Sequence, residues 1–299
     1  MIDKEAFKAV CKNVVFDEPM RCHTTFKIGG AADIFAMPES EDEVRGIAEL
    51  CRKSGIPYMI MGNGSNMLVS DKGIRGAVIQ IGKNMSSCRI DGEKVYAQAG
   101  ILMSALANAV LNEELTGFET LSGIPGTLGG GIYMNAGAYG GELSSVVEAV
   151  TYLNENGEVI TQSADKLGFG YRKSIFQNGK LTVLSCVLHL KKGSRDEILE
   201  AMKDYNHRRS SKQPLSMPSA GSTFKRPEGY FAGKLIQDSG LMGFSIGGAQ
   251  VSEKHAGFIV NKGGATAKDV LDLIEYVQKT VYDKFSVHLE PEVRLIGEV

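Results

Sequence analysis

Segments with apolar residues at helical spacing alternate with short apolar runs in the first part of the chain. Residues 40–55 have the helical pattern, with Ser40 before the first turn and Glu43 three residues later. This combination predicts a helix that begins with a capping box and stops at Gly55. Residues 102–115 also have helical spacing, and the apolar runs of strand length are residues 56–62, 67–71, 76–82 and 93–100. Helices that alternate with strands predict an α/β arrangement for this region.

Longer elements follow. Residues 146–163 contain a central Asn-Gly pair between two strand-like runs, which predicts a β-hairpin. Residues 181–193 predict a long strand. A helix is predicted over residues 194–214, with Ser194 and Glu197 as a second capping box and with basic residues at its end, where they favour a helix dipole.

The character of the chain then changes. Residues 214–233 form a polar segment of about twenty residues, and structureless loops of that length are usually functional. A long helix over residues 266–285 and a last strand over residues 288–297 complete the chain. We therefore expect a domain boundary near residue 200, between domains of residues 1–200 and 201–299.

Composition excludes several classes of protein. The chain has 299 residues, 43% of them hydrophobic and 23% charged, and a net charge of −2 that gives no general attraction to nucleic acid. Its five cysteines are widely spaced without a C-x-x-C pair, so we expect reduced thiols and neither a disulfide framework nor a metal site. No apolar stretch approaches the roughly 20 residues that span a bilayer. These features predict a cytoplasmic protein, and the absence of an evident dimer seam predicts a monomer.

Two glycine-rich loops are the first candidates for chemistry. Residues 61–71 read MGNGSNMLVSD, and residues 121–142 read LSGIPGTLGGGIYMNAGAYGGE. Glycine lets backbone N–H groups approach a phosphate closely, so the pair could hold one diphosphate from both sides. Neither loop matches the usual nucleotide-binding fingerprints, because the P-loop lysine and the third glycine of the dinucleotide motif are missing. Tight turns and close helix packing would explain the same glycines equally well.

Six motifs in this order carry a resemblance: TTFKIGGAADIF, MGNGSNMLVSD, SGIPGTLGGGIYMNAGAYG, GFGYRKSIF, AGSTFKRP and LEPEVRLIG. Over nearly its whole length the chain closely resembles the UDP-N-acetylenolpyruvoylglucosamine reductases, flavoenzymes of bacterial peptidoglycan synthesis. The resemblance implies an α+β fold, with an FAD-binding domain of the vanillyl-alcohol-oxidase type before a smaller α+β substrate-binding domain. It implies FAD and NADPH as cofactors. The residues implied in FAD binding are Gly62, Asn63, Gly64, Ser65, Asn66, Ser122, Gly123, Pro125, Gly126 and Gly130.

The resemblance also implies a reaction. NADPH reduces FAD, and the flavin then delivers hydride to an enolpyruvyl ether of a UDP-sugar, giving a lactyl ether. Arg172 matches the arginine that stabilises the resulting enolate, Ser222 the proton donor to carbon, and Glu292 the acid at the substrate carboxylate. Without this context each would be ordinary, since an arginine or a strand glutamate is usually solvated and a serine in a polar loop is usually a turn residue. Glu290, on the same expected strand face, is the alternative to Glu292.

Substrate contacts are implied for the C-terminal part. Lys212, Lys225 and Arg226 suit a diphosphate, although each alone would be an ordinary surface cation. Arg226 replaces an asparagine of the family's longer form. His255 would face the substrate or be an uncommitted histidine. The chain lacks the inserted tyrosine loop of the longer form and resembles the shorter one.

Two other functions stay open on the sequence. An FAD-dependent oxidase or dehydrogenase of the same fold would act on an alcohol, and a binding module would keep the fold without catalysis. Some relatives of this fold attach FAD covalently through a histidine or a cysteine, and Cys22 and His23 precede the first motif. Because the reductases hold FAD non-covalently, we interpret both residues as local structure.

Overall fold

The chain forms two compact units in a computed structural model that describes residues 2–179 and 181–298. Unit 2 takes two segments from the first quarter of the sequence in addition to the C-terminal part. Unit 1 comprises Met1–Phe16, Ile34–Asn63 and Gly76–Arg208, and unit 2 comprises Asp17–Asp33, Gly64–Arg75 and Arg209–Val299. The domain boundary near residue 200 stays a prediction; the last change of unit falls at Arg208–Arg209, inside helix α5 (Arg195–Lys212).

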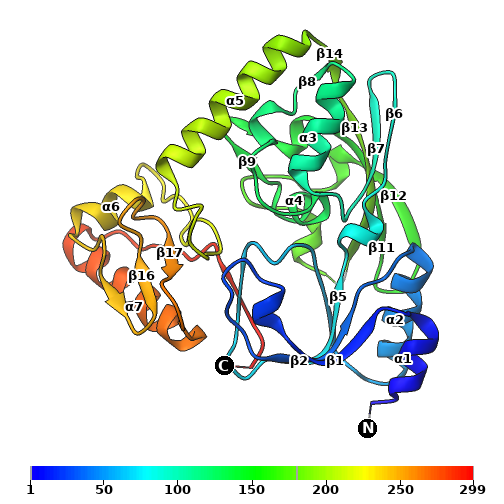
Figure 1. The fold of residues 1–299 in the computed structure, drawn as a ribbon, viewed down its shortest axis with the longest axis horizontal. Coiled ribbons are helices and arrows are strands. Elements are labelled where there is room, and N and C mark those ends of the chain that lie inside the picture. Colours follow the sequence, from blue (N-terminus) through cyan, green and yellow to red (C-terminus); the bar gives the residue numbers. More distant parts are fainter. Residues whose placement is uncertain (1, 180, 299) are drawn as a thin grey trace. The chain divides into compact units, whose positions relative to one another are not determined.

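A five-stranded sheet forms the main layer of unit 1 (Figure 1). Its order is β12-β11-β13-β7-β6, with all neighbours antiparallel. The alternation of helices and strands along the sequence therefore does not produce a parallel α/β sheet here. The strands are β6 (Cys88–Asp91), β7 (Lys94–Gln98), β11 (Val147–Leu153), β12 (Val159–Ser163) and β13 (Thr182–His189).

The predicted hairpin is confirmed. β11 and β12 pair from Ala149↔Ser163 to Leu153↔Val159, and Gly157 in the turn has φ 87°, a value that glycine adopts without strain. The long strand predicted over residues 181–193 is divided in two. β13 ends at His189, and β14 (Lys191–Lys192) pairs with β8 (Leu115–Thr116) instead.

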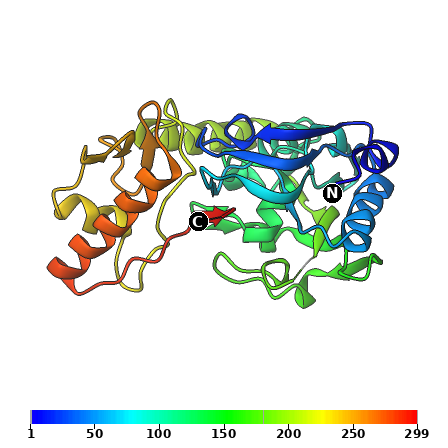
Figure 2. The same cartoon turned by 90° about the horizontal axis from the view of Figure 1, so that it is seen from below.

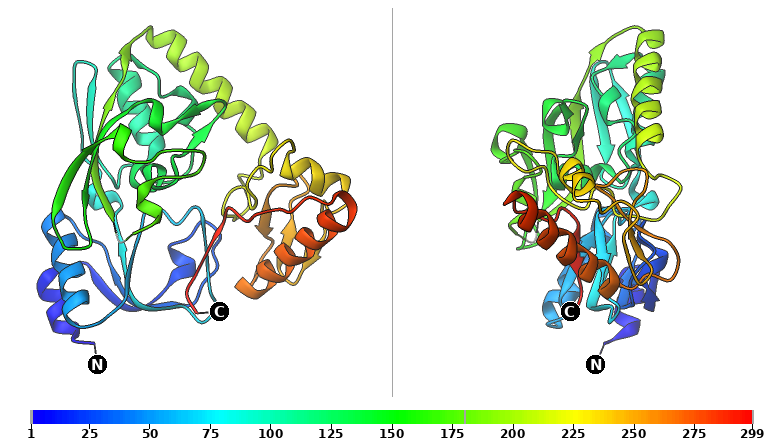
Figure 3. Two further views of the ribbon diagram at one scale, coloured as in Figure 1. Left: turned by 180° about the vertical axis from the view of Figure 1, so that it is seen from behind. Right: turned by 90° about the vertical axis from the view of Figure 1, so that its left-hand side faces the viewer.

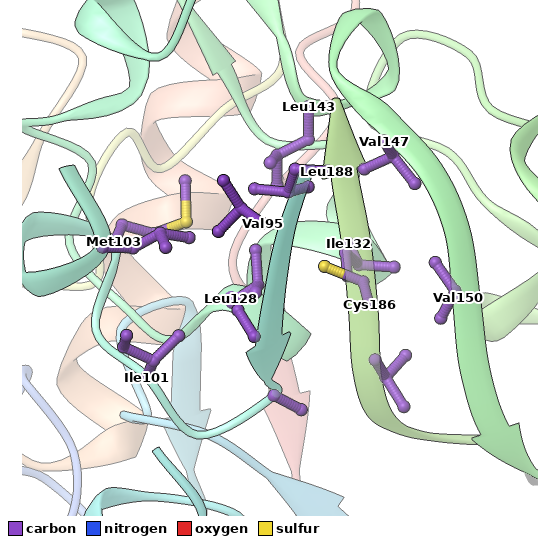
Figure 4. Packing of buried hydrophobic residues seen from close by; sticks show 14 of the residues in the cluster. Val95, Ile101, Met103, Leu128, Ile132, Leu143, Val147, Val150, Cys186 and Leu188 are labelled. Carbon is purple, nitrogen blue, oxygen red and sulfur yellow. The ribbon is translucent and has the colours of Figure 1, made fainter. Parts of the chain in front are cut away.

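The main core of unit 1 lies between this sheet and helices α3 (Met103–Asn112) and α4 (Leu128–Met134). Figure 4 shows Leu128 and Ile132 of α4 directed toward Val95 and Cys186 of the sheet. All four side chains are at most 3% exposed. Burial of a leucine or isoleucine side chain stabilises the fold by about 1.5–3 kcal/mol. Leu128 and Ile132 therefore hold α4 against the sheet although three of its residues are glycine.

A second sheet has the order β1-β2-β5-β3, and β3 pairs with β5 in parallel. Its strands are β1 (Val14–Pro19), β2 (Ala31–Ala36), β3 (Tyr58–Met61) and β5 (Ile74–Gln80). Helices α1 (Lys4–Val10) and α2 (Glu41–Lys53) lie side by side in Figures 1 and 2. The predicted start of α2 is confirmed, since Ser40 Oγ accepts from Glu43 N at 3.2 Å. The Glu43 carboxylate bonds the N–H of Glu39 instead of Ser40, one residue earlier than in a capping box.

Unit 2 has its own core around helix α7 (Ala267–Phe285), which packs against the small antiparallel sheet β15-β16-β17 (Figure 3). The sequence pattern does not predict helix α6, because residues 214–233 are polar and typical of a loop and the run after them has no strong periodicity. The elements are α6 (Ala232–Asp238), β15 (Ser245–Ile246), β16 (Ala249–Val251) and β17 (Ile259–Asn261).

The last strand is shorter than the sequence predicts. β18 comprises Arg294–Ile296 and pairs in parallel with β4 (Met67–Val69), from the first glycine loop. The predicted strand over residues 288–297 is therefore wrong for its first half. Pro291 has no N–H to offer a ladder, and it makes an isolated bridge with Phe224. Glu290 and Glu292 thus precede the strand and do not share one of its faces. A pair of two-residue strands in unit 1, β9 (Gly137–Ala138) and β10 (Gly141–Glu142), completes the elements.

The start of α7 allows a test of stability. Thr266 Oγ1 accepts from Asp269 N at 3.0 Å, and the Asp269 carboxylate accepts from Thr266 N at 3.0 Å, which is a complete capping box. We expect Thr266→Ala to lower the free energy of unfolding by about 1 kcal/mol, the usual effect of losing an N-cap. Urea unfolding would measure it. Thr280 lies near the other end of α7 and is only partly buried; its hydroxyl bonds the carbonyl of Tyr276, which already belongs to the helix. Thr280→Ala should therefore change stability by less than about 0.5 kcal/mol, and equal losses would contradict the capping argument.

Candidate functional site

The two glycine loops meet within unit 1. A Cβ on Gly62 would lie 2.1 Å from Thr127 Oγ1, and Thr127 is the N-cap residue of α4. Gly62 therefore lies against the start of the helix that follows the second loop. Close packing alone requires glycine at position 62, so this residue is not by itself a sign of a ligand.

The three consecutive glycines of α4 differ in what they face. A Cβ on Gly129 would lie 2.9 Å from the Cβ of Ala99, and a Cβ on Gly131 would lie 2.7 Å from Cδ1 of Leu143. Packing explains these two. Gly130 is exposed, and a Cβ there would meet only Thr127 Oγ1, at 3.6 Å. A glycine inside a helix destabilises it by about 1 kcal/mol relative to alanine, and no neighbouring group among the described residues of unit 1 requires glycine at position 130. A bound cofactor that approached this backbone closely would require it.

The other loop residues are constrained in different ways. Gly126 and Gly64 have φ 123° and 61°, so their backbone conformations favour glycine whatever is bound. Ser122 is buried, and its hydroxyl donates to the carbonyl of Glu119 at 2.7 Å. Pro125 and Asn63 are exposed, while Gly123 and Ser65 are partly buried.

Asn66 forms two hydrogen bonds with the segment that carries the candidate acid. Its side-chain amide donates to the carbonyl of Glu292 at 3.2 Å, and its own carbonyl accepts from Arg294 N at 3.1 Å. Both bonds lie within unit 2. The end of the first glycine loop therefore holds the segment that carries the candidate acid.

Ser222 and Glu292 are joined through Thr223. The carbonyl of Thr223 accepts from Glu292 N at 2.8 Å, and Thr223 N donates to the carbonyl of Gly257 at 2.8 Å. The Thr223 side chain is 4% exposed, and its Oγ1 accepts from Ile259 N at 3.0 Å. Ser222 is exposed and Glu292 partly exposed. A buried threonine whose N–H, carbonyl and Oγ1 all make hydrogen bonds thus fixes the backbone of both candidate catalytic residues.

Lys225 and Glu290 form an ion pair, and Lys225 N donates to the carbonyl of Glu290 at 2.8 Å. Glu290 has 70% of its side chain exposed. Arg226 lies with its guanidinium 4.0 Å from the ring centre of Phe231, and its Nε donates to the carbonyl of Tyr230 at 3.3 Å. Two cations therefore stand on the segment that follows Ser222, one of them held by an aromatic ring.

His255 is a hydrogen-bond donor at neutral pH. Its Nδ1 accepts from Gly257 N at 3.1 Å, so the proton of the neutral ring is on Nε2. Burial lowers the pKa of His255, and the charge of nearby Lys212 lowers it further. The ring meets Phe258 edge-on, with centres 5.1 Å apart.

Arg172 lies in unit 1, in a two-residue turn between Gly170 and Lys173, whose backbones exchange hydrogen bonds of 3.1 and 3.0 Å. Its φ is 53°, a left-handed conformation that costs a non-glycine residue roughly 1–2 kcal/mol. The guanidinium donates to the carbonyl of Gly137 at 3.1 Å and lies 5.3 Å from the ring centre of Tyr171. Strain of this kind persists where the surrounding structure holds it, often at functional sites.

Asn135, which the sequence analysis missed, supports this turn. It is completely buried and has φ 42°. Its amide nitrogen donates to the carbonyl of Gly170 at 3.0 Å and to Glu142 at 2.9 Å, and its oxygen accepts from Ser144 N at 2.9 Å. The NAG sequence of the loop offered a hint, because asparagine tolerates left-handed conformations better than most residues.

His23 lies 2.7 Å from Glu18, five residues earlier in the chain, through Nε2. In the part of the chain that the structure describes, no three His, Cys, Asp or Glu side chains are grouped so that they could hold a metal ion. None of the helices described is both long and apolar enough to cross a membrane.

The candidate residues are divided between the units. Unit 1 holds Gly62, Asn63, Ser122, Gly123, Pro125, Gly126, Gly130 and Arg172. Unit 2 holds Gly64, Ser65, Asn66, Lys212, Ser222, Lys225, Arg226, His255 and Glu292. Within unit 1, Gly62 lies against Thr127 at the start of α4. Within unit 2, separately, backbone hydrogen bonds join the segment of Ser222 and Lys225 to the segment of Glu292.

Comparisons with known proteins identify the family. Residues 213–296 match the family described as UDP-N-acetylenolpyruvoylglucosamine reductase, C-terminal domain, and residues 32–163 match the FAD binding domain family. These matches confirm the predicted fold class, an FAD-binding domain followed by a smaller C-terminal domain.

Proteins named UDP-N-acetylenolpyruvoylglucosamine reductase are similar over nearly the whole chain. One from Alkaliphilus oremlandii is 54% identical, over 98% of both chains. One from Caldanaerobacter subterraneus subsp. tengcongensis is 52% identical, over 100% of this chain and 98% of the relative. The crystal structure of the enzyme from Thermus caldophilus is 34% identical, with a TM-score of 0.82 over 95% of this chain and 98% of that one. The chain therefore belongs to the UDP-N-acetylenolpyruvoylglucosamine reductase family.

Proposed function

We propose that this chain reduces UDP-N-acetylglucosamine enolpyruvate to UDP-N-acetylmuramate with FAD and NADPH, a step of bacterial peptidoglycan synthesis. The observation that carries the proposal is the frame in unit 2, where Thr223 and Asn66 hold the backbone of Glu292 beside the Ser222 segment. This frame lies in the region that matches the reductase C-terminal domain. An FAD-dependent oxidase or dehydrogenase of the same fold acting on an alcohol is not favoured, because that match is specific to the reductase.

The residues of unit 1 fit a flat cofactor at α4. Gly130 presents bare backbone that packing does not explain, and Gly126 keeps the preceding turn free of a side chain. We propose that FAD is held by Gly62, Asn63, Ser122, Gly123, Pro125, Gly126 and Gly130 of unit 1 and by Gly64, Ser65 and Asn66, which follow Asn63 directly in the chain. When bound, FAD would supply hydride, taken from NADPH, to the methylene carbon of the enol ether.

Arg172 is assigned to the substrate carboxylate. Its guanidinium is planar and permanently charged, so it can bind a carboxylate through two parallel hydrogen bonds. The same charge stabilises the enolate that develops next to that carboxylate when the double bond is reduced. The bond to the Gly137 carbonyl limits the orientations that the guanidinium adopts before substrate arrives.

Ser222 is assigned as the proton donor to carbon and Glu292 as the acid at the carboxylate. A hydroxyl is a weak acid in water, so Ser222 needs a site that stabilises its alkoxide or replaces its proton. Glu292 must be protonated or hydrogen-bonded when it faces the substrate, because two bare carboxylates repel. The shared backbone frame sets the spacing of the two residues.

The diphosphate and sugar are assigned to Lys212, Lys225, Arg226 and His255. Lys225 pairs with Glu290, whose side chain is mostly exposed, so a diphosphate can compete with this carboxylate for the ammonium group. Neutral His255 offers its Nε2 proton as a donor.

We also propose that the chain is a cytoplasmic monomer without nucleic-acid partners. Light scattering of the purified protein would test the oligomeric state.

The function is tested by NADPH oxidation with and without UDP-N-acetylglucosamine enolpyruvate. The purified protein should be yellow, NADPH should bleach it, and addition of the enol ether should restore the colour as UDP-N-acetylmuramate forms. Mass spectrometry would identify the product. A protein that takes up no FAD, or one whose reduced flavin is reoxidised by an aldehyde or ketone and not by the enol ether, would refute the proposal.

Gly130→Ala separates cofactor contact from backbone requirements. Space for the methyl group exists, and alanine should stabilise the helix of the apoprotein by roughly 0.5–1 kcal/mol. We nevertheless expect FAD affinity to fall about tenfold or more, because the methyl group would stand where the cofactor approaches. Flavin fluorescence titration of the apoprotein would measure this. Unchanged FAD affinity in a stabilised Gly130→Ala variant would place the cofactor elsewhere.

Gly126→Val and Gly64→Val should also weaken FAD binding. Both positions have positive φ values, so valine would strain the backbone there as well.

A further inference from the structure

Arg172 needs external support for its backbone. Its φ of 53° is a conformation that side chains with a Cβ rarely adopt. The turn bonds between Gly170 and Lys173 close the turn around it, but they do not touch the peptide groups of Arg172 itself. A hydrogen bond made directly to those peptide groups would fix the position of the Arg172 backbone, from which the side chain extends.

Gln177 makes such a bond. It is the last residue of the short 3-10 helix η6 (Ile175–Gln177) and is partly buried. Its Nε2 donates to the carbonyl of Arg172 at 2.9 Å and to the carbonyl of Tyr133 at 3.0 Å. An amide nitrogen has two hydrogens, so it can serve both carbonyls; the Sδ of Met134, 3.6 Å away, is a weaker acceptor beside them. Tyr133 belongs to the last turn of α4, the helix that carries Gly130.

We infer that Gln177 is a positioning residue for Arg172, tying its left-handed backbone to the end of α4. This inference rests on the proposed role of Arg172 at the substrate carboxylate. Ser174 reinforces the connection, since its Oγ donates to the same Tyr133 carbonyl at 2.7 Å. The amide of Gln177 thus joins the turn that carries the guanidinium to the helix that we assign to the cofactor. Both lie in unit 1.

The role demands a donor at this position. Glutamate has the same shape, but its oxygens would face two carbonyl oxygens and repel them. Methionine fills similar space and donates nothing. Either change leaves the charge and length of Arg172 intact and alters only where its backbone rests. Because a misplacement of about 1 Å can reduce a rate by roughly 100-fold, the effect should reach the substrate step.

Gln177→Glu and Gln177→Met are the test variants, prepared as FAD-loaded full-length protein. We expect NADPH to bleach the flavin within about twofold of the parent rate, while reoxidation by saturating UDP-N-acetylglucosamine enolpyruvate slows about tenfold or more. Calorimetric titration of the oxidised protein, which does not turn over, should show weaker binding of the same compound. The matched control is Gln250→Glu, since Gln250 is 6% exposed and its Nε2 donates to the carbonyl of Gly243 at 2.8 Å. It should lower the melting temperature and leave both half-reactions near parent rates.

A double-mutant cycle with Arg172→Ala decides whether Gln177 acts through Arg172. If it does, Gln177→Met in the Arg172→Ala background should slow reoxidation by less than about twofold. A full additional loss in that background would overturn the inference, as would reoxidation and binding near parent values in both single variants of Gln177. If Arg172→Ala itself reoxidises normally, the proposed role of Arg172 fails instead, and that failure is visible without the Gln177 variants.

Discussion

Glu292→Gln is expected to lower turnover by about 100-fold or more, the usual contribution of general acid catalysis. Glutamine has the shape of glutamate and can still donate a hydrogen bond, so substrate affinity should change little. It cannot give up a proton, which is the function that we assign to Glu292. The bonds from Glu292 N to Thr223 and from Asn66 to the Glu292 carbonyl involve only the backbone of residue 292 and survive the change. Steady-state turnover and calorimetric affinity would measure the two quantities.

Glu290→Gln is the matched control, two residues earlier. Glu290 is exposed and pairs with Lys225. An exposed ion pair contributes about 0–1 kcal/mol, so the variant should stay within about fivefold of the parent in both quantities. If Glu290→Gln loses turnover and Glu292→Gln keeps it, the assignment of the acid within the EPEVR sequence is wrong.

Ser222→Ala is expected to separate the two half-reactions. NADPH should bleach the flavin at the parent rate, because flavin reduction needs no proton from Ser222. Reoxidation by the enol ether should slow by roughly 100- to 10,000-fold, the range for loss of a positioned proton donor. The buried neighbour Thr223 carries the structural bonds of this segment, so the fold should tolerate the change. Anaerobic rapid-mixing absorbance would follow both steps; near-parent reoxidation would assign the proton to water or to another residue.

Local sequence signals predicted several elements correctly. Ser40 starts α2 because its side chain bonds a backbone N–H three residues later, which needs no distant partner. The Asn-Gly pair likewise favours the β11–β12 hairpin through its own backbone preferences, which also need no distant partner. The resemblance carried by six motifs led to the family, which the comparisons confirm.

Other features depended on residues far apart in sequence. The end of the strand predicted over residues 288–297 pairs with β4, more than two hundred residues earlier, and Pro291 keeps the first half out of a ladder. Helix α6 carries no strong pattern of its own, and its buried residues Leu235 and Ile236 pack in the core of unit 2. Their burial stabilises the helix only after that core has formed.

The sequence alone determined which residue types are available: the glycines that permit close approach, the arginine, the serine and the two glutamates. It did not distinguish a glycine required by packing from one left open. Gly129 and Gly131 face Ala99 and Leu143, whereas Gly130 faces solvent, and this difference depends on what the folded chain places beside α4. The tertiary structure likewise decided that Asn66 bonds Glu292 and that Gln177 bonds Arg172. The Asn66–Glu292 bond spans 226 residues, and the second bond of Gln177, to the carbonyl of Tyr133, spans 44. No local pattern marks either bond, because hydrogen bonding depends on distance in space and not on distance in sequence.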